Sequence, residues 1–234
     1  MSCDEGRGPQ ARPAKVGSMM TLEALIRLTL GLKPAERVLV AVAGPPASGK
    51  STLAHDLASG LCDAGRSAAV VPMDGFHLDD CILTERGDLA RKGAPWTFDT
   101  GGFAALVARL AANADDVIYV PVFDRSLELS HASARAVPAD TEVLVVEGNY
   151  LLLDDPAWAE AAQHYDMTVM LDVDLETLTQ RLHDRWLDFG LSPDLAREKA
   201  AENDLPNGTL VVTKSRRADV YLAGTGPKGK PAPR

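Results

Sequence analysis

Residues 44–52 read Gly44-Pro45-Pro46-Ala47-Ser48-Gly49-Lys50-Ser51-Thr52 and match the pattern G-x-x-x-x-G-K-[ST] at every fixed position. This pattern is typical of a loop that binds phosphate groups between a strand and a helix. The apolar, β-branched run at residues 38–43 precedes it, and apolar residues at helical spacing follow it until Gly65 can end the helix. Because both flanking elements are the expected ones, we predict a phosphate-binding loop rather than a glycine-rich turn that binds nothing.

The residue types of this loop suit a nucleoside triphosphate. Gly44 and Gly49 allow backbone angles that side chains disfavour, so successive N–H groups can turn toward a phosphate, and the helix N-terminus adds partial positive charge. Lys50 can reach the β- and γ-phosphates, and the Ser51 hydroxyl can ligate Mg²⁺. We therefore predict ATP and Mg²⁺ as cofactors. The residues expected to contact the nucleotide are Gly44, Pro45, Ala47, Ser48, Gly49, Lys50, Ser51 and Thr52.

The composition is that of an ordinary globular protein, with 46% hydrophobic and 24% charged residues, and 234 residues suffice for one well-buried α/β domain. A net charge of -9 argues against a protein that coats nucleic acid. No apolar run approaches the roughly twenty residues of a membrane span. Cys3, Cys62 and Cys81 show no C-x-x-C spacing that would indicate a zinc site. We expect a cytoplasmic protein without a nucleic-acid or membrane partner.

The order of the expected elements predicts the fold. Residues 1–17 and 224–234 have the composition of disordered tails, and residues 18–223 form the expected domain. Strands alternating with helices predict an α/β fold, with a parallel sheet of about five strands, helices on both faces and a small lid at about 181–200. Residues 75–101 lack periodicity and read as a loop or short helices covering the site. The strands are expected at 38–43, 68–73, 117–122, 143–146 and 167–173, with a last short strand at 218–222. A first helix is expected from Ser18, or from Thr21 as the alternative cap, to near Gly31 and Pro34, and further helices at 50–64, 103–110, 156–163 and 175–186.

Two acidic residues follow strands of this sheet, at the edge where ligands bind. Asp74 would lie across from the phosphate loop, where a carboxylate can orient an attacking hydroxyl and accept its proton. An aspartate that caps the following turn is the alternative for Asp74. Glu147 closes the apolar strand E-V-L-V-V-E-G and is placed to hold Mg²⁺, which prefers few carboxylates together with phosphate and water. The alternative for Glu147 is a solvent-exposed residue at a strand end.

Arg181 and Arg185 stand at positions i and i+4 of a predicted helix, so both side chains point the same way. They could close over the nucleotide and offset charge that develops in the transition state. Surface ion pairs with Asp184 or Asp188 are the alternative. The five histidines form no ligand pair at helical spacing, so they predict no metal site, and His77 alone stands near the candidate base.

These motifs together resemble the phosphoribulokinase/uridine kinase superfamily of P-loop kinases, over residues ~35 to ~222. Residues 91–99, R-K-G-A-P-W-T-F-D, look like the R-K-G-x-P-x-S-Y-D segment of its pantothenate kinases. Asp124-Arg125 stands where those enzymes carry Ser-His, which argues against pantothenate as the substrate. The chain is most similar to a bacterial group of nucleoside/nucleotide kinase-like proteins, some linked to fructose-transport operons. The runs shared with that group are M-D-G-F-H-L-D-D, R-K-G-A-P-x-T-F-D, E-G-N-Y-L-L-L and N-D-L-P-N.

The resemblance implies a kinase that transfers the γ-phosphate of ATP to a hydroxyl of a nucleoside-like or sugar-like metabolite. It makes Asp74 the base, gives Lys50 and Ser51 the phosphates and metal, and places Arg181 and Arg185 in the lid. Related kinases are often dimers, so a homodimer is expected by analogy. The acceptor would be surrounded by Phe76, His77, Arg91, Lys92, Phe98, Phe123, Asp124, Arg125, Glu128, Asn149 and Tyr150.

Three alternatives differ in function. The first is a pantothenate kinase-like activity, and the second is a nucleotide-binding regulator without catalysis, against which the acceptor-side carboxylate of Asp74 argues. The third is a GTPase-type switch, which requires an N/T-K-x-D motif. The nearest string, Thr213-Lys214-Ser215-Arg216, carries arginine where the aspartate is needed.

Overall fold

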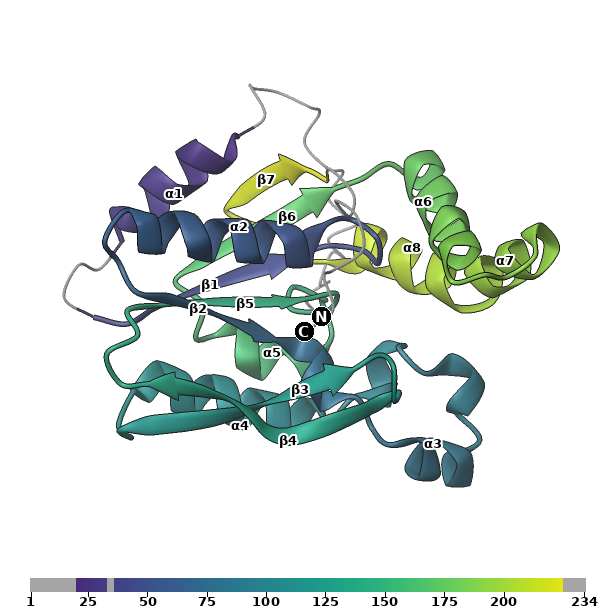
Figure 1. Cartoon of the computed structure of the whole chain (residues 1–234), viewed down its shortest axis with the longest axis horizontal. Coiled ribbons are helices and arrows are strands. Elements are labelled where there is room, and N and C mark those ends of the chain that lie inside the picture. Colours follow the sequence, from purple (N-terminus) through teal and green to yellow (C-terminus); the bar gives the residue numbers. More distant parts are fainter. Residues whose placement is uncertain (1–19, 33–35, 225–234) are drawn as a thin grey trace, which may run out of the picture.

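The computed structural model of the chain describes residues 20–32 and 36–224. Its centre is a parallel sheet of five strands in the order β2-β5-β1-β6-β7 (Figure 1). The predicted α/β fold with a five-stranded parallel sheet is therefore confirmed. Of the tails predicted at 1–17 and 224–234, only Gly224 is among the described residues. The strands are β1 (Val38–Ala43), β2 (Ala68–Pro72), β5 (Val143–Gly148), β6 (Met167–Asp172) and β7 (Val220–Ala223).

Helices cover both faces of the sheet, because β1 is apolar at every position and so needs a partner on each side. Val38, Val40 and Val42 point toward α2 (Lys50–Asp63), on which α1 (Leu22–Leu30) packs. The alternate residues point to the opposite face, which α4 (Thr100–Ala112) and α5 (Pro156–Ala162) cover (Figure 1). The core thus lies in two layers, one on each side of the sheet.

Local signals fix where the first helices begin and end. Thr21 caps α1, and its hydroxyl accepts a hydrogen bond from the N–H of Ala24 at 3.3 Å. The helix after the phosphate loop ends at Asp63, and Gly65 then takes a left-handed φ of 85°. Thr21 is the alternative cap of the prediction, and Ser18, the other candidate, lies outside the described residues. The helix α2 ends within two residues of the predicted stop at Gly65, since stop residues are local features of the sequence.

The prediction that residues 117–122 join the parallel sheet is wrong. This segment is β3 (Val117–Asp124), which pairs antiparallel with β4 (Leu129–Pro138) in a separate two-stranded sheet. The hairpin packs one apolar row, with Ile118, Val120 and Val137, into the same core layer as α4. The strand β4 was not predicted, because most of its side chains are exposed and it lacks an apolar run.

Beyond the carboxyl ends of the strands, two groups of short helices flank the phosphate loop (Figure 1). Residues 75–101 were predicted as a loop or short helices. They contain the end of one 3₁₀ turn, two further 3₁₀ turns, the helix α3 (Asp80–Arg86) and the first residues of α4. On the other side, α6 (Leu175–Asp188) and α7 (Pro193–Lys199) contain most of the segment predicted as a lid. A π-helix, η4 (Ala200–Asp204), joins α7 to α8 (Leu205–Lys214). The limits of the predicted domain and lid stay predictions.

Several sequence-based exclusions concern the described residues. Every helix among them is too short or too polar to traverse a lipid bilayer. The same residues contain no group of three or more His, Cys, Asp or Glu side chains that could hold a metal ion. Cys62 and Cys81 are exposed free thiols, and Cys3 lies outside the described residues.

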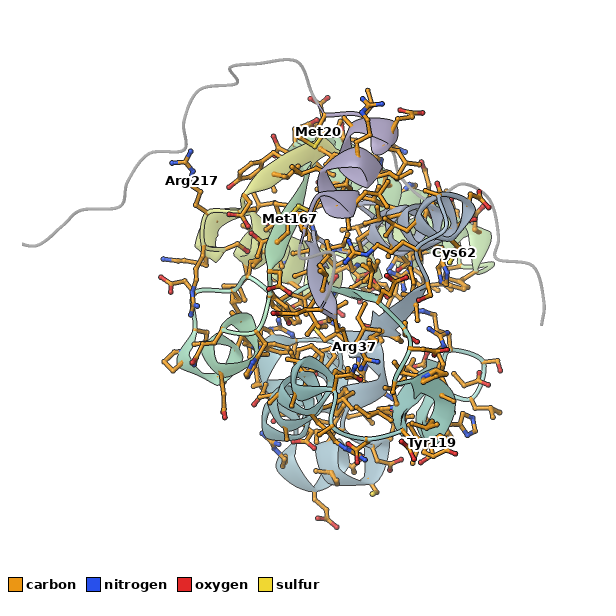
Figure 2. All side chains as sticks on the ribbon, turned by 90° about the vertical axis from the view of Figure 1, so that its left-hand side faces the viewer. Met20, Arg37, Cys62, Tyr119, Met167 and Arg217 are labelled. Carbon is orange, nitrogen blue, oxygen red and sulfur yellow. The ribbon has the colours of Figure 1, made fainter. Side chains whose placement is uncertain are left out.

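Arg37, which is labelled in Figure 2, immediately precedes β1, at the end of the strand away from the phosphate loop. The Arg37 guanidinium donates to backbone oxygens of Thr141 at 2.9 Å, Leu110 at 3.2 Å and Pro138 at 2.7 Å. These acceptors belong to three chain segments that precede β5, end α4 and end β4. Arg37 therefore connects both sheets to α4 by charge-assisted hydrogen bonds.

We expect Arg37→Met to lower the free energy of unfolding by about 2 kcal/mol, because it leaves several carbonyl oxygens without their donor. Chemical denaturation monitored by circular dichroism measures this change. Arg217→Met is the matched control, since the Arg217 side chain projects from the surface in Figure 2 and should tolerate the change. Equal stability of the two variants would show that the Arg37 bonds add nothing.

Candidate active site

The register of the sheet brings the candidate site residues to one edge. Glu147, at the end of β5, pairs with Val42 of β1 on one side and with Pro72 of β2 on the other. The phosphate loop follows β1 directly, and Asp74 lies two residues beyond Pro72. The loop, the strand-end glutamate and the candidate base are therefore neighbours, as the order of the elements predicts.

The phosphate loop has the backbone that anion binding requires. Gly49 has a φ of 93° and Ala47 a φ of 58°, both in the left-handed region. Within the described chain, no side chain caps the first N–H groups of α2, and the buried Ser48 Oγ has no hydrogen-bond partner. These polar groups at a helix N-terminus can meet phosphate oxygens. The contacts predicted for residues 44–52 with a nucleotide stay predictions.

The charge of Lys50 is set by its surroundings. Removal of its ammonium group from water lowers the pKa of Lys50, and the carboxylates of Glu147 and Asp74 oppose that shift. The two acids therefore lie close enough to Lys50 to act on its charge. The base candidate and the phosphate-loop lysine therefore lie at the same edge of the sheet rather than on opposite sides of the molecule.

Ser51 and Glu147, the two predicted metal ligands, are in contact. The Ser51 hydroxyl donates to the Glu147 carboxylate at 3.0 Å, and Glu147 is 7% exposed. Burial raises the pKa of Glu147, and the positive charge of Lys50 partly offsets this shift. Two adjacent hard oxygen donors beside a phosphate loop fit Mg²⁺, which takes its remaining ligands from phosphate and water. The alternative of a solvent-exposed Glu147 is wrong.

Asp74 lies on the 3₁₀ turn η1 (Met73–Phe76) and forms an ion pair across the site. Its Oδ2 lies 2.5 Å from Nη2 of Arg125, at the start of the β3–β4 turn. Burial would raise the pKa of Asp74, but the surrounding positive charge, that of Arg125 above all, outweighs burial, so this pKa is lower than usual. Asp74 is therefore ionised and can accept a proton.

An aromatic stack lines the site beside Asp74. The His77 ring lies 4.1 Å from the Phe98 ring and 4.5 Å from the Phe123 ring, between centroids. Nδ1 of His77 lies 2.8 Å from the backbone oxygen of Asp74, which can only accept, so Nδ1 carries the proton. Burial lowers the pKa of His77, so its imidazole is neutral near pH 7.

Three aromatic residues predicted near the acceptor also pack on other rings of the core. Tyr150 is fully buried, and its hydroxyl donates to the backbone oxygen of Gly93 at 2.6 Å. Phe98 is 5% exposed and meets Tyr150 edge to face at 5.7 Å. Phe76 packs edge to face on Phe103 at 5.4 Å. The full burial of Tyr150 and the use of its hydroxyl by Gly93 do not support its predicted contact with an acceptor, and the contacts predicted for Phe76 and Phe98 stay predictions.

The other polar residues predicted near the acceptor differ in whether their polar atoms already have hydrogen-bond partners in the protein. Lys92 donates to Asp80 at 2.6 Å and to the backbone oxygen of Glu128 at 2.6 Å. The Asp124 carboxylate is used within its own turn, as described below. Asn149 stands out, because its Oδ1 is buried and accepts no hydrogen bond from the described residues. Asn149 is thus able to accept a hydrogen bond from a ligand.

Arg91 connects the acceptor side to η4 and α8, and the sequence did not predict this contact. Its Nε donates to Oδ1 of Asn203 at 3.1 Å, and its Nη2 to Oδ1 of Asn207 at 3.4 Å. Asn203 donates back to the oxygen of Lys92 at 2.7 Å. The N-D-L-P-N run at residues 203–207 was the available signal, but its spacing does not reveal the partner, which is more than a hundred residues away.

The two lid arginines reach the site from α6. Arg181 Nη2 donates to the oxygen of Gly224 at 2.8 Å, and Gly224 abuts the loop so closely that an added Cβ would lie 2.8 Å from the Ser48 oxygen. Burial lowers the pKa of Arg185, and the charges of Asp204 and Asp74 act in the opposite direction. In the described part of the chain, neither arginine forms the alternative ion pair with Asp184 or Asp188.

The helix α6 is also fixed to the π-helix. Nε1 of Trp186 donates to Oδ2 of Asp204 at 2.7 Å. Since Asn203, the neighbour of Asp204, contacts Arg91, a short chain of hydrogen bonds runs from α6 through η4 to the acceptor side. A π-helix often marks a functional site, because its wider turn displaces side chains from the regular helical positions.

A parallel sheet whose first strand ends in a phosphate loop, facing a strand-end glutamate and an acceptor-side aspartate, defines a P-loop kinase. The sequence profile of the phosphoribulokinase / uridine kinase family matches residues 39–187. The chain therefore belongs to this family, as its motifs predict.

Individual relatives agree with this assignment. "Putative uridine kinase C227.14" of Schizosaccharomyces pombe is 36% identical over 199 residues, covering 82% of this chain and 85% of that protein. "Uncharacterized protein YggC" of Escherichia coli is 32% identical over 200 residues, covering 83% and 81%. A crystal structure described as a "putative fructose transport system kinase" from Silicibacter sp. TM1040 is 42% identical, with a TM-score of 0.82, covering 87% and 99%. These names differ in the substrate they give, so similarity assigns the class of kinase and leaves the acceptor open.

We expect Glu147→Gln to raise the Mg²⁺ concentration needed for half-maximal ATP turnover by roughly 10-fold to 100-fold, because the carboxamide carries no charge to attract the metal. A titration of turnover with Mg²⁺ at fixed ATP measures this change. Since a proton competes with the metal and burial raises the pKa of Glu147, Mg²⁺ affinity should fall as the pH is lowered in the unmodified protein.

The phosphates of ATP also bind protons, so both ATP and Glu147 contribute to the pH dependence of Mg²⁺ affinity, and the variant distinguishes the two contributions. In Glu147→Gln the part that Glu147 contributes should disappear, while the part that ATP contributes should remain. Identical pH profiles of Mg²⁺ affinity in both proteins would remove Glu147 from the metal site.

Proposed function

We propose that this kinase transfers the γ-phosphate of ATP, with Mg²⁺, to a hydroxyl of a small nucleoside-like or sugar-like metabolite. One observation carries the proposal: the sheet register places Asp74, two residues beyond Pro72 of β2, at the same edge as the phosphate loop that follows β1 and as Glu147, which is hydrogen-bonded to Ser51. A protein that only binds a nucleotide has no need of an ionised carboxylate on the acceptor side of its phosphate loop.

The reaction follows from the positions of these groups. The acceptor oxygen attacks the γ-phosphorus while the bond from that phosphorus to the β–γ bridging oxygen breaks, which releases ADP. The proton of the acceptor hydroxyl passes to the Asp74 carboxylate, and later to solvent. Lys50 stabilises the phosphate charge during this transfer. Mg²⁺, when bound by Ser51 and Glu147, would neutralise charge on the phosphates.

Arg181 and Arg185 supply positive charge from the lid side. Arg181 reaches the loop through Gly224, and its Nη1 is buried with no hydrogen-bond partner among the described residues. Arg185 is close enough to Asp74 for their charges to interact. Arginines near the transferred group can stabilise the charge that spreads over its oxygens in the transition state.

We expect Asp74→Asn to lower kcat by roughly 10²-fold to 10⁴-fold while ATP affinity changes little, because the base acts only in the chemical step. Steady-state kinetics and equilibrium binding of an ATP analogue measure the two effects. Lys50→Ala is the contrasting variant, and it should weaken nucleotide binding and turnover together. Near-normal turnover in Asp74→Asn would remove Asp74 from the role of base.

A panel of acceptors distinguishes a kinase from a regulator. We expect ATP consumption to rise severalfold with one class among nucleosides, ketoses, pentose phosphates and pantothenate, and to stay low with water alone. The coupled release of ADP, with identification of the phosphorylated product by mass spectrometry, measures this dependence. ATP binding without acceptor-dependent consumption across the panel would favour the regulator.

Pantothenate belongs in that panel as the alternative substrate of this family. The position of Arg125 argues against it, because the residue that replaces the histidine of pantothenate kinases is paired with the candidate base. The uridine kinase name of one relative favours nucleosides, and the fructose-transport name of another favours sugars. The panel therefore includes both classes.

A further inference from the structure

The ion pair of Arg125 with Asp74 poses a chemical problem for the proposed function. Nη2 of Arg125 lies 2.5 Å from the carboxylate oxygen Oδ2. A carboxylate that must accept a proton from a hydroxyl is weakened as a base while a guanidinium holds it. The arginine side chain is 58% exposed and the aspartate 21%, so Arg125 is the more solvent-accessible member of the pair. A solute can therefore reach the guanidinium while it is paired with Asp74.

The turn that carries Arg125 is fixed independently of this ion pair. Oδ1 of Asp124 accepts from the backbone N–H of Ser126 at 2.8 Å, the Ser126 hydroxyl at 2.6 Å and the N–H of Leu127 at 3.2 Å. These bonds hold the backbone of the turn without any contribution from the guanidinium. Arg125 can therefore exchange its partner by rotating its side chain alone.

Two neighbouring cations, Lys92 and Arg91, are paired with groups other than the candidate base. Lys92 is paired with Asp80 at 2.6 Å and with Glu128 at 3.6 Å. Arg91 is held by Asn203 and Asn207. In the ion pairs formed by the described residues, Arg125 is the cation whose carboxylate partner is the candidate base itself. Among these cations, Arg125 is the one whose release would also free the base.

We propose that the acceptor carries an oxyanion, a carboxylate or a phosphate, close to the hydroxyl that is phosphorylated, and that Arg125 exchanges Asp74 for this oxyanion. The planar guanidinium suits both groups, because it can donate two parallel hydrogen bonds to either. The exchange frees the Asp74 carboxylate when a suitable acceptor is present. Water and uncharged alcohols leave Arg125 on Asp74, so the pair also limits idle hydrolysis of ATP. This inference rests on the proposed function and narrows its substrate class.

Matched probes test the exchange directly. The full chain is first saturated with Mg²⁺ and a non-hydrolysable ATP analogue, so that the phosphate loop is filled. Calorimetric titration then compares glycerate with glycerol, ribose 5-phosphate with ribose, and acetate with inorganic phosphate. We expect the anionic member of each mixed pair to bind at least about 10-fold more tightly, and the carboxylate and phosphate probes to show which oxyanion is preferred.

Variants assign the binding to Arg125. Arg125→Gln should weaken the anions by roughly 10-fold to 100-fold and leave the uncharged probes unchanged, and Arg125→Lys should retain part of the preference. Asp74→Asn should bind the anions more tightly, because the carboxylate no longer competes for the guanidinium. Arg109→Gln is the matched control, since Arg109 forms a similar exposed pair with Asp115 at 2.8 Å, at the other end of β3. This control should bind every probe as the unmodified protein does.

The outcomes separate this inference from the proposed function. If none of the anions binds in a way that depends on Arg125, the exchange is wrong, even where neutral acceptors are phosphorylated and Asp74→Asn is inactive. If the anions bind through Arg125 and Asp74→Asn binds them more tightly, the exchange stands, even where no acceptor stimulates ATP consumption and the kinase proposal fails. In active protein, Arg125→Gln should also raise acceptor-independent hydrolysis of ATP severalfold relative to Arg109→Gln.

Discussion

The electrostatic balance around Lys50 is the constraint on which the site depends. A cation withdrawn from water is costly unless anions approach it, and the sheet supplies two carboxylates at its ends. They reach Lys50 because β5 lies between β1 and β2, with Glu147 in register with Val42 and Pro72. The strand order β2-β5-β1 is therefore as important to the chemistry as the loop itself.

The parts of the fold that the sequence predicts are those with local signals. The strand β1 is recognisable because it is buried on both faces, and α1 and α2 have caps or glycine stops. The hairpin was not predicted because most side chains of β4 are exposed and it has no apolar run. The pairing of β3 also depends on which strand lies beside β2 in the main sheet, and that strand is β5. That choice is made by tertiary packing, and no local pattern records it.

The candidate site likewise has one part that local motifs predict and another part that depends on tertiary structure. Lys50, Ser51, Glu147 and Asp74 were predicted from a motif and from strand ends, and the sheet brings them together. The acceptor side was harder, because an aromatic residue near a site can line it or support it. Tyr150 supports it, which becomes clear only once its contacts with Phe98 and Trp158 are known. The Arg125–Asp74 pair joins residues 51 positions apart and likewise follows from the tertiary structure alone.

The π-helix η4 has a mechanical consequence. On one side it holds α6 through Asp204 and Trp186, and on the other it holds the acceptor segment through Asn203 and Arg91. Each link is a polar, directional bond, which tolerates less sliding than apolar packing does. A rotation of α6 must therefore either carry Arg91 with it or break one of these bonds. Movement of the lid helix α6 is therefore coupled to movement of the acceptor segment through the π-helix η4.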